Sequence, residues 1–76
     1  MTDQSGPDPA AALQDTVARD RGRLLSALIR ELRDFQLAED ALQDAAEAAL
    51  VHWARSGVPT DPRAWLLRVG RRKAID

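Results

Sequence analysis

The charged side chains of this sequence fall into an acidic and a basic group, a pattern that favours the binding of charged partners. Residues 31–47 contain six acidic residues and one basic residue, whereas residues 63–76 contain five basic residues and one acidic residue. In a helix, residues at i, i+3, i+4 and i+7 share one face, and the acidic segment has this spacing at Asp40, Gln43, Asp44 and Glu47. The basic group is Arg68, Arg71, Arg72 and Lys73. This segregation favours one basic and one anionic partner, although two solvated helix faces would carry the same charges.

Catalytic groups are missing from this sequence. There is no Cys and a single His, His52, so neither thiolate ligands nor a set of histidines can hold a zinc ion. The spacing of the carboxylates brings no acid–base pair together, no nucleophile lies beside His52, and there is no glycine-rich phosphate loop. We therefore expect no enzymatic activity, no metal and no cofactor. His52 is interpreted as a hydrogen-bonding residue between helices.

Three helices are needed to position the charged groups, and apolar residues at three- and four-residue steps predict them. The predicted spans are 13–34, 37–55 and 62–75. Asp61 and Pro62 are typical of an N-cap followed by a first helical residue, and Gly57 marks the loop before them. The expected core is built on seven apolar residues: Leu24, Leu28, Leu32, Leu42, Trp53, Trp65 and Val69.

The predicted fold is all-α, a small three-helix bundle with a disordered N-terminal leader. A chain of 76 residues has room for one domain. Residues 1–12 are expected to form the leader, because they contain Gly6 and two prolines, and residues 13–76 to form the helical domain. The N-terminal segment has neither a basic start nor an apolar run, so we expect no secretion signal, no membrane anchor and a cytoplasmic location.

Two runs of residues carry a resemblance to a known family. Residues 38–44 read AEDALQD, and residues 62–76 read PRAWLLRVGRRKAID. Their order and spacing resemble region 2 of the extracytoplasmic-function sigma factors, in which an AED run with a following Gln and acid precedes an AWL run. The resemblance extends over residues 17–76, and residues 21–30 are also similar to a subgroup of these factors.

The resemblance implies a partner for each charged group. In this family the second helix binds the basic clamp helices of the largest RNA polymerase subunit, and the matching residues are Asp40, Gln43, Asp44 and Glu47. The third helix contacts and helps to melt the promoter −10 element, and the matching residues are Arg68, Arg71, Arg72 and Lys73. An unstacked base enters a pocket beside the loop that here contains Val58, Pro59 and Thr60. Anti-sigma or other regulatory proteins are a further class of partner.

Departures from the family pattern leave other functions open. Ala46 stands where the family usually has Phe, which is expected to leave a cavity or a closer helix approach, and Gly70 replaces the usual Ala and is expected to loosen the third helix. The chain ends at Asp76 without the domain that reads the −35 element, so we expect a trimmed piece of a longer factor or a natural remnant. The alternative functions are a regulatory remnant that binds polymerase without starting transcription, and a helical protein-interaction module with no DNA role.

Overall fold

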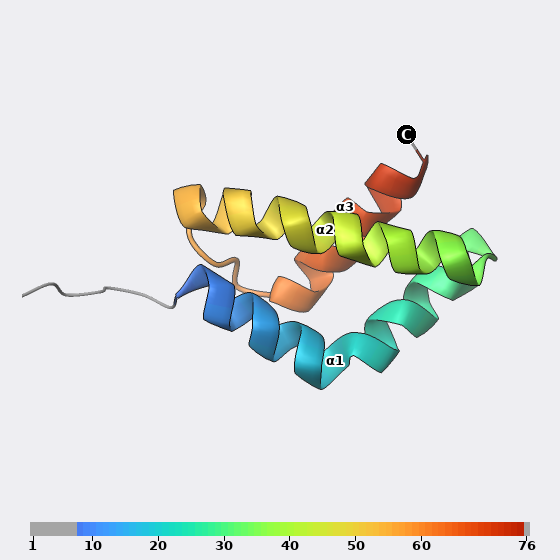
Figure 1. Ribbon diagram of the computed structural model, residues 1–76, viewed down its shortest axis with the longest axis horizontal. Helices are drawn as coiled ribbons and strands as arrows, with labels where there is room; N and C mark the ends of the chain where they lie inside the picture. Colours follow the sequence, from blue (N-terminus) through green and yellow to red (C-terminus); the bar gives the residue numbers. More distant parts are fainter. Residues whose placement is uncertain (1–7, 76) are drawn as a thin grey trace, which may run out of the picture.

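The computed structural model describes residues 8–75, which form three α-helices: α1 (Pro9–Leu32), α2 (Phe35–Ser56) and α3 (Pro62–Ile75). α1 and α2 run antiparallel, and α3 crosses behind α2, so that each helix contacts the other two (Figure 1). Residues 8–75 contain no strand. The predicted all-α three-helix bundle is therefore confirmed.

The first helix begins earlier than predicted, at Pro9 rather than at Leu13. Asp8 is the N-cap, and its carboxylate accepts a hydrogen bond from a backbone N–H of the first turn (3.3 Å). The additional turn also packs, because Ala12 lies against the core next to the buried Leu13. The predicted leader is thus wrong for its last four residues, and residues 1–7 lie outside the described part of the chain.

A two-residue joint turns the chain from α1 back into α2. Arg33 adopts the left-handed conformation (φ 60°), and its backbone N–H donates to the carbonyl oxygen of Ile29 (2.7 Å). Asp34 then caps α2, because its carboxylate accepts a hydrogen bond from the N–H of Leu37 (2.9 Å). The break between the first two helices therefore lies two residues before the predicted break at residues 35–36.

The connection between α2 and α3 follows the predicted signals. Gly57 ends α2 with φ 93°, a conformation that favours glycine, and its N–H donates to the carbonyl oxygen of Trp53 (2.9 Å). The carboxylate of Asp61 accepts a hydrogen bond from the N–H of Ala64 (3.1 Å), and Pro62 begins α3. The start of α3 is therefore confirmed, because its capping residues are adjacent in the sequence.

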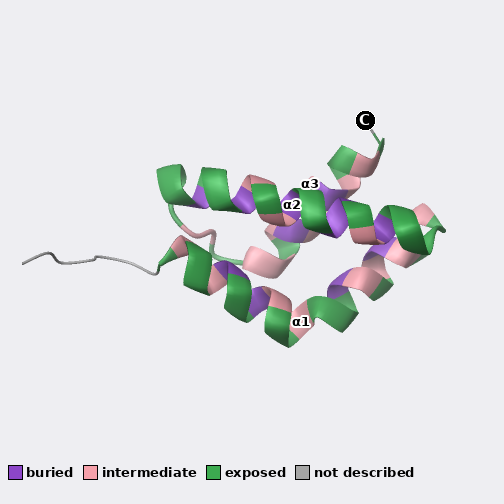
Figure 2. Ribbon diagram, viewed as in Figure 1, coloured by how far each residue is buried: buried purple, intermediate pink, exposed green. Residues whose placement is uncertain are grey.

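The core combines a few large side chains with a row of alanines on α2. The predicted core residues Leu24, Leu28, Leu42 and Trp53 are buried, whereas Leu32, Trp65 and Val69 are partly buried and pack at its edge. Leu66 is fully buried and completes the core from α3. The buried positions follow the inner faces of the helices (Figure 2). The buried alanines are Ala38, Ala41, Ala45 and Ala49. Small side chains on this face let neighbouring helices approach α2 closely.

An open depression lies beside Ala46. Leu13, Val17 and Ala46 line an apolar depression of about 630 Å³ between α1 and α2. Ala46 itself is only partly buried. The expected outcomes are a cavity or a closer approach of the helices. The structure has a space at this position, and that space is open to the surface.

Gly70 has a packing role that its sequence context did not indicate. It is buried, and a Cβ atom built on it would lie 3.3 Å from the backbone carbonyl oxygen of Ala41 and 3.6 Å from Cδ1 of Leu28. The backbone of α3 therefore lies directly against α2 at this point. Glycine is expected to weaken α3. At this position it also permits a close contact with α2, which a larger residue would disrupt.

Replacing Gly70 by Val should lower the free energy of unfolding by about 1–3 kcal/mol, because the branched side chain has no space beside the Ala41 carbonyl. Gly22→Val is the matched control, since no heavy atom lies within 4 Å of a Cβ at that position of α1. We expect the control to change stability by less than about 0.5 kcal/mol. Urea denaturation followed by circular dichroism measures both, and equal effects at the two glycines would contradict the packing role of Gly70.

Candidate binding surfaces

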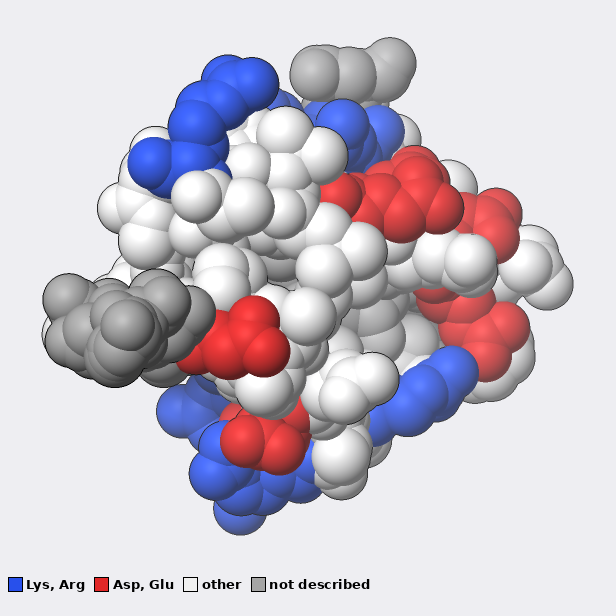
Figure 3. Space-filling model, turned by 60° about the vertical axis from the view of Figure 1, so that its left-hand side comes forward, with Lys and Arg blue, Asp and Glu red and all other residues white. Residues whose placement is uncertain are grey.

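The four residues of the predicted acidic surface lie together on the outer face of α2. Asp40, Gln43, Asp44 and Glu47 are all exposed, and together they line a shallow depression of about 340 Å³. Asp40 also accepts a hydrogen bond from Nε2 of Gln36 (3.2 Å). The structure thus confirms that these residues share a face, which we call the acidic stripe. In the view of Figure 3 most acidic side chains lie on the right-hand side, and further acidic side chains lie at the left and beside the basic side chains at the bottom.

The acidic stripe continues into an apolar patch toward the C-terminal end of α2. Leu50 is 48% exposed and Val51 is 55% exposed. Both are absent from the predicted surface, although they follow Gln43 and Asp44 by seven residues, which is about two helical turns. Large apolar side chains at such exposure supply contact area to a partner. One face of α2 therefore offers charge at its N-terminal half and apolar area at its C-terminal half.

Three of the four predicted basic residues line a pocket between α2 and α3. The pocket encloses about 370 Å³, and its lining combines bases, two aromatic rings and small apolar residues: Ala48, His52, Trp65, Arg68, Val69, Arg72 and Lys73. The three bases are exposed at its rim. We call this site the basic pocket. Its composition suits a ligand that is anionic at one end and flat and aromatic at the other.

Aromatic rings form the inner wall of the basic pocket. The ring centroids of His52 and Trp65 are 6.0 Å apart, and Trp65 in turn meets Trp53 edge to face at 5.4 Å. His52 is exposed and contacts Trp65 through its ring, so its interpretation as a hydrogen-bonding residue between helices is replaced by ring packing. Trp65 is partly buried, which agrees with its predicted core position and still leaves part of the ring at the pocket.

Arg71 is held apart from the other bases. Its Nη1 donates to both carboxylate oxygens of Glu31 on α1, at 2.8 and 3.1 Å. The two side chains are 43% and 46% exposed, so the pair is solvated and contributes at most about 1 kcal/mol to stability. A phosphate that binds Arg71 must compete with Glu31. The predicted DNA contact of Arg71 stays a prediction, and it has a competitor that sequence spacing does not reveal.

The predicted base-pocket residues of the loop between α2 and α3 do not line the basic pocket. Val58 is partly buried and packs against the core, Pro59 is partly buried, and Thr60 is exposed. None of the three carries an aromatic ring. The pocket lining comes instead from α2 and α3.

Within residues 8–75, no group of three or more His, Cys, Asp or Glu side chains is arranged to hold a metal ion. None of the three described helices combines the length and the apolar composition that a membrane crossing requires.

Comparison with known proteins agrees with this geometry. Residues 16–76 match the sigma-70 region 2 family. A protein of Rhizobium meliloti (strain 1021) that is described as uncharacterized is 48% identical over 56 residues, which are 74% of this chain and 13% of that protein. The chain thus spans a small part of this relative's length. No solved structure matches the chain. Because the family match includes most of α1 and the whole of α2 and α3, with both charged surfaces, the chain belongs to the sigma-70 family through its region 2.

Proposed function

We propose that the chain is region 2 of an extracytoplasmic-function sigma factor that binds RNA polymerase through the acidic stripe and holds the opened −10 strand at the basic pocket. The observation that carries the proposal is the presence of both surfaces on one small bundle. A stripe of acids lies on the outer face of α2, and bases beside aromatic rings lie where α2 meets α3. Family membership supports a role in transcription initiation rather than in catalysis. This role belongs in the cytoplasm, where the polymerase works.

The acidic stripe suits the clamp helices of the largest polymerase subunit. Those helices present a basic surface in this family, and a row of carboxylates along one helix face is complementary to it. Leu50 and Val51 extend the same face with apolar side chains, which add affinity by leaving water. The clamp contact is therefore proposed to run along most of α2, with charge setting the orientation and apolar area strengthening the complex.

The basic pocket suits one or two nucleotides of a separated strand. Arg68, Arg72 and Lys73 can contact phosphates, and the exposed ring of His52 with the edge of Trp65 offers a surface on which a base can stack. Removing a base from the duplex costs a few kcal/mol, and stacking on an aromatic ring offsets about 1–3 kcal/mol of this. The loop residues Val58, Pro59 and Thr60 are proposed to border the captured base without stacking on it.

A second candidate function follows from the ion pair of Arg71. Because Glu31 pairs with Arg71, one of the four proposed DNA contacts is weakened, whereas the proposed polymerase surface is not affected. This arrangement fits a regulatory module that occupies the clamp helices without opening promoters. An in vitro transcription assay separates the two functions, because only the first one yields transcripts from a factor that contains this region 2.

Reversal of a single charge tests the polymerase surface. Asp44→Lys should weaken binding of the chain to the isolated clamp helices more than about tenfold, because it places a cation against a basic partner. Asp15→Lys is the matched control, since Asp15 is an exposed acid on α1. Titration calorimetry measures both variants, and circular dichroism verifies that they remain helical. Equal affinities for the two variants would reject the acidic stripe as the clamp contact.

Removal of two pocket bases tests the DNA surface. Arg68→Gln with Arg72→Gln should reduce the salt dependence of binding to short single-stranded DNA by about 1.4 units in the slope of log K against log salt, which corresponds to two lost phosphate contacts. Bound DNA should also quench the fluorescence of Trp65. Arg21→Gln with Arg55→Gln changes the net charge equally at exposed positions outside the pocket. An equal loss of slope in the two double variants would contradict the proposed pocket. Fluorescence that does not respond to DNA would contradict it as well.

A further inference from the structure

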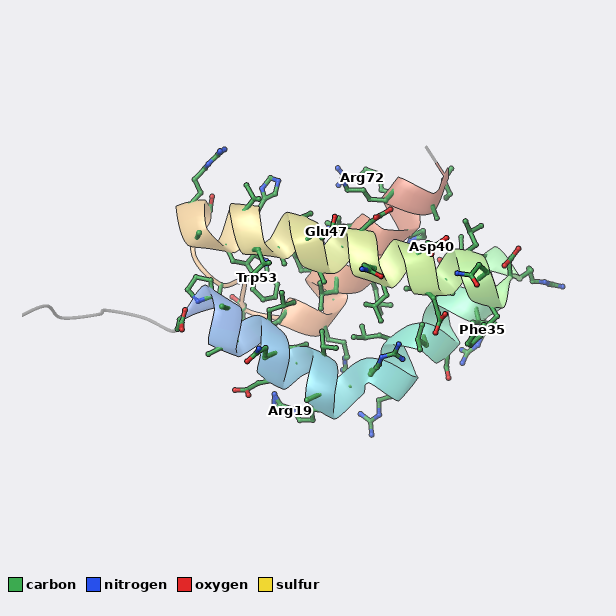
Figure 4. All side chains as sticks on the ribbon, in the orientation of Figure 1. Arg19, Phe35, Asp40, Glu47, Trp53 and Arg72 are labelled. Carbon is green, nitrogen blue, oxygen red and sulfur yellow. The ribbon has the colours of Figure 1, made fainter. Side chains whose placement is uncertain are left out.

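A row of arginine side chains on α1 has no part in either proposed surface. Its members are exposed and follow one another at i, i+4, i+11 and i+14: Arg19, Arg23, Arg30 and Arg33. This spacing keeps them within one arc of the helix surface, and we call them the arginine row. Arg19 points away from the bundle, on the side opposite to Glu47 and Arg72 (Figure 4). Arg19 therefore faces away from Glu47 of the acidic stripe and from Arg72 of α3.

The arginine row lacks acidic partners inside the bundle. Arg21, Arg63 and Arg71 each have a carboxylate oxygen within 4.0 Å, on Glu39, Asp20 and Glu31 respectively. Within residues 8–75, no such ion pair is formed by a member of the row. Like charges at i and i+4 on a helix destabilise it by about 0.2–0.5 kcal/mol. Arg19 and Arg23 therefore repel one another, and a bound anion would remove that repulsion.

Helix electrostatics account for only half of the row. Arg30 lies in the last turn of α1 and Arg33 is its C-cap, where a positive charge interacts favourably with the helix dipole. Arg19 and Arg23 lie in the middle of the helix, where the dipole has no such effect. The helix dipole therefore does not explain their position, and the inference rests on these two residues.

The chemistry of the row fits a phosphodiester backbone better than a protein. Protein contacts are dominated by large apolar anchors that fill pockets, and α1 has no exposed large apolar side chain among its described residues. The guanidinium group binds phosphate through two parallel hydrogen bonds, which favours arginine at such sites. From Arg19 to Arg30 the row follows the helix for about 17 Å, which corresponds to about five base pairs of duplex DNA.

We propose that the arginine row binds the phosphate backbone of duplex DNA, without reading its sequence, as a second contact separate from the basic pocket. The choice of DNA as the anion rests on the proposed role in promoter opening, whereas the row is distinct from the residues that perform that role. Such a contact holds the duplex beside the region that opens, and it adds affinity in proportion to the number of phosphates neutralised.

The 76-residue chain and a fluorescently labelled duplex of arbitrary sequence test the proposal. Arg19→Gln with Arg23→Gln should reduce the slope of log K against log salt by about 1.8 units, because two phosphate contacts are lost. Arg21→Gln with Arg55→Gln is the matched control of equal net charge, with one residue on another face of α1 and one on α2. We expect this control to lose less than about 0.5 units. Equal losses in the two double variants, or no loss in either, would overturn the proposal.

Two further measurements separate this inference from its competitors and from the proposed function. The chain is also tested with poly-glutamate as a model of an acidic protein. An affinity for poly-glutamate equal to that for duplex DNA, with the same dependence on Arg19 and Arg23, would overturn the assignment to DNA. Clamp-helix binding and quenching of Trp65 by single-stranded DNA should be unchanged in Arg19→Gln with Arg23→Gln, because these signals come from α2 and α3. Loss of those signals in this variant would show that the row acts through the whole fold and would also overturn the proposal.

Discussion

The position of α3 against α2 depends on the packing of Trp53. This side chain is only 2% exposed, and Trp65 rests edge to face on it. The contact places the ring of Trp65 between the core and the basic pocket, so one residue belongs to both. At the other end of the interface, Gly70 lets the two backbones approach. With α3 fixed at both points, Arg68 and Arg72 have to project outward, and the location of the pocket follows from the packing of the core.

The same packing separates opposite charges on a bundle whose net charge is −1. Carboxylates on the outer face of α2 repel a nucleic acid that approaches the bases of α3, and this repulsion extends over a Debye length of about 8 Å at physiological salt. A partner that covers the acidic stripe would remove the repulsion. In the proposed complex, polymerase binding therefore also strengthens DNA binding, because the protein that neutralises the acids leaves the bases exposed.

Local signals in the sequence were sufficient for the helices and for the acidic stripe. Helical periodicity and the Asp61–Pro62 pair predicted three helices and the start of α3, and four residues at helical spacing do share a face. An Asp–Pro pair also begins α1 at Asp8 and Pro9, but the second proline nearby favoured a leader there. Features that arise between helices were not predictable. The partner of Arg71 lies 40 residues away in the sequence, and only the docking of α3 on α1 brings Glu31 to it.

The two-residue joint after α1 also has a kinetic consequence. Closing a short connection costs little chain entropy, so α1 and α2 can pair with only a small loss of freedom. The contacts of α3 join residues that are farther apart, such as Leu28 with Gly70, and they require the α1–α2 hairpin as a surface. Contacts between neighbours in sequence dominate such a bundle, and folds of this kind form in microseconds to milliseconds. During synthesis, the helix that carries the acidic stripe leaves the ribosome before α3, so its residues are free to pair with α1 before the bases of the basic pocket emerge.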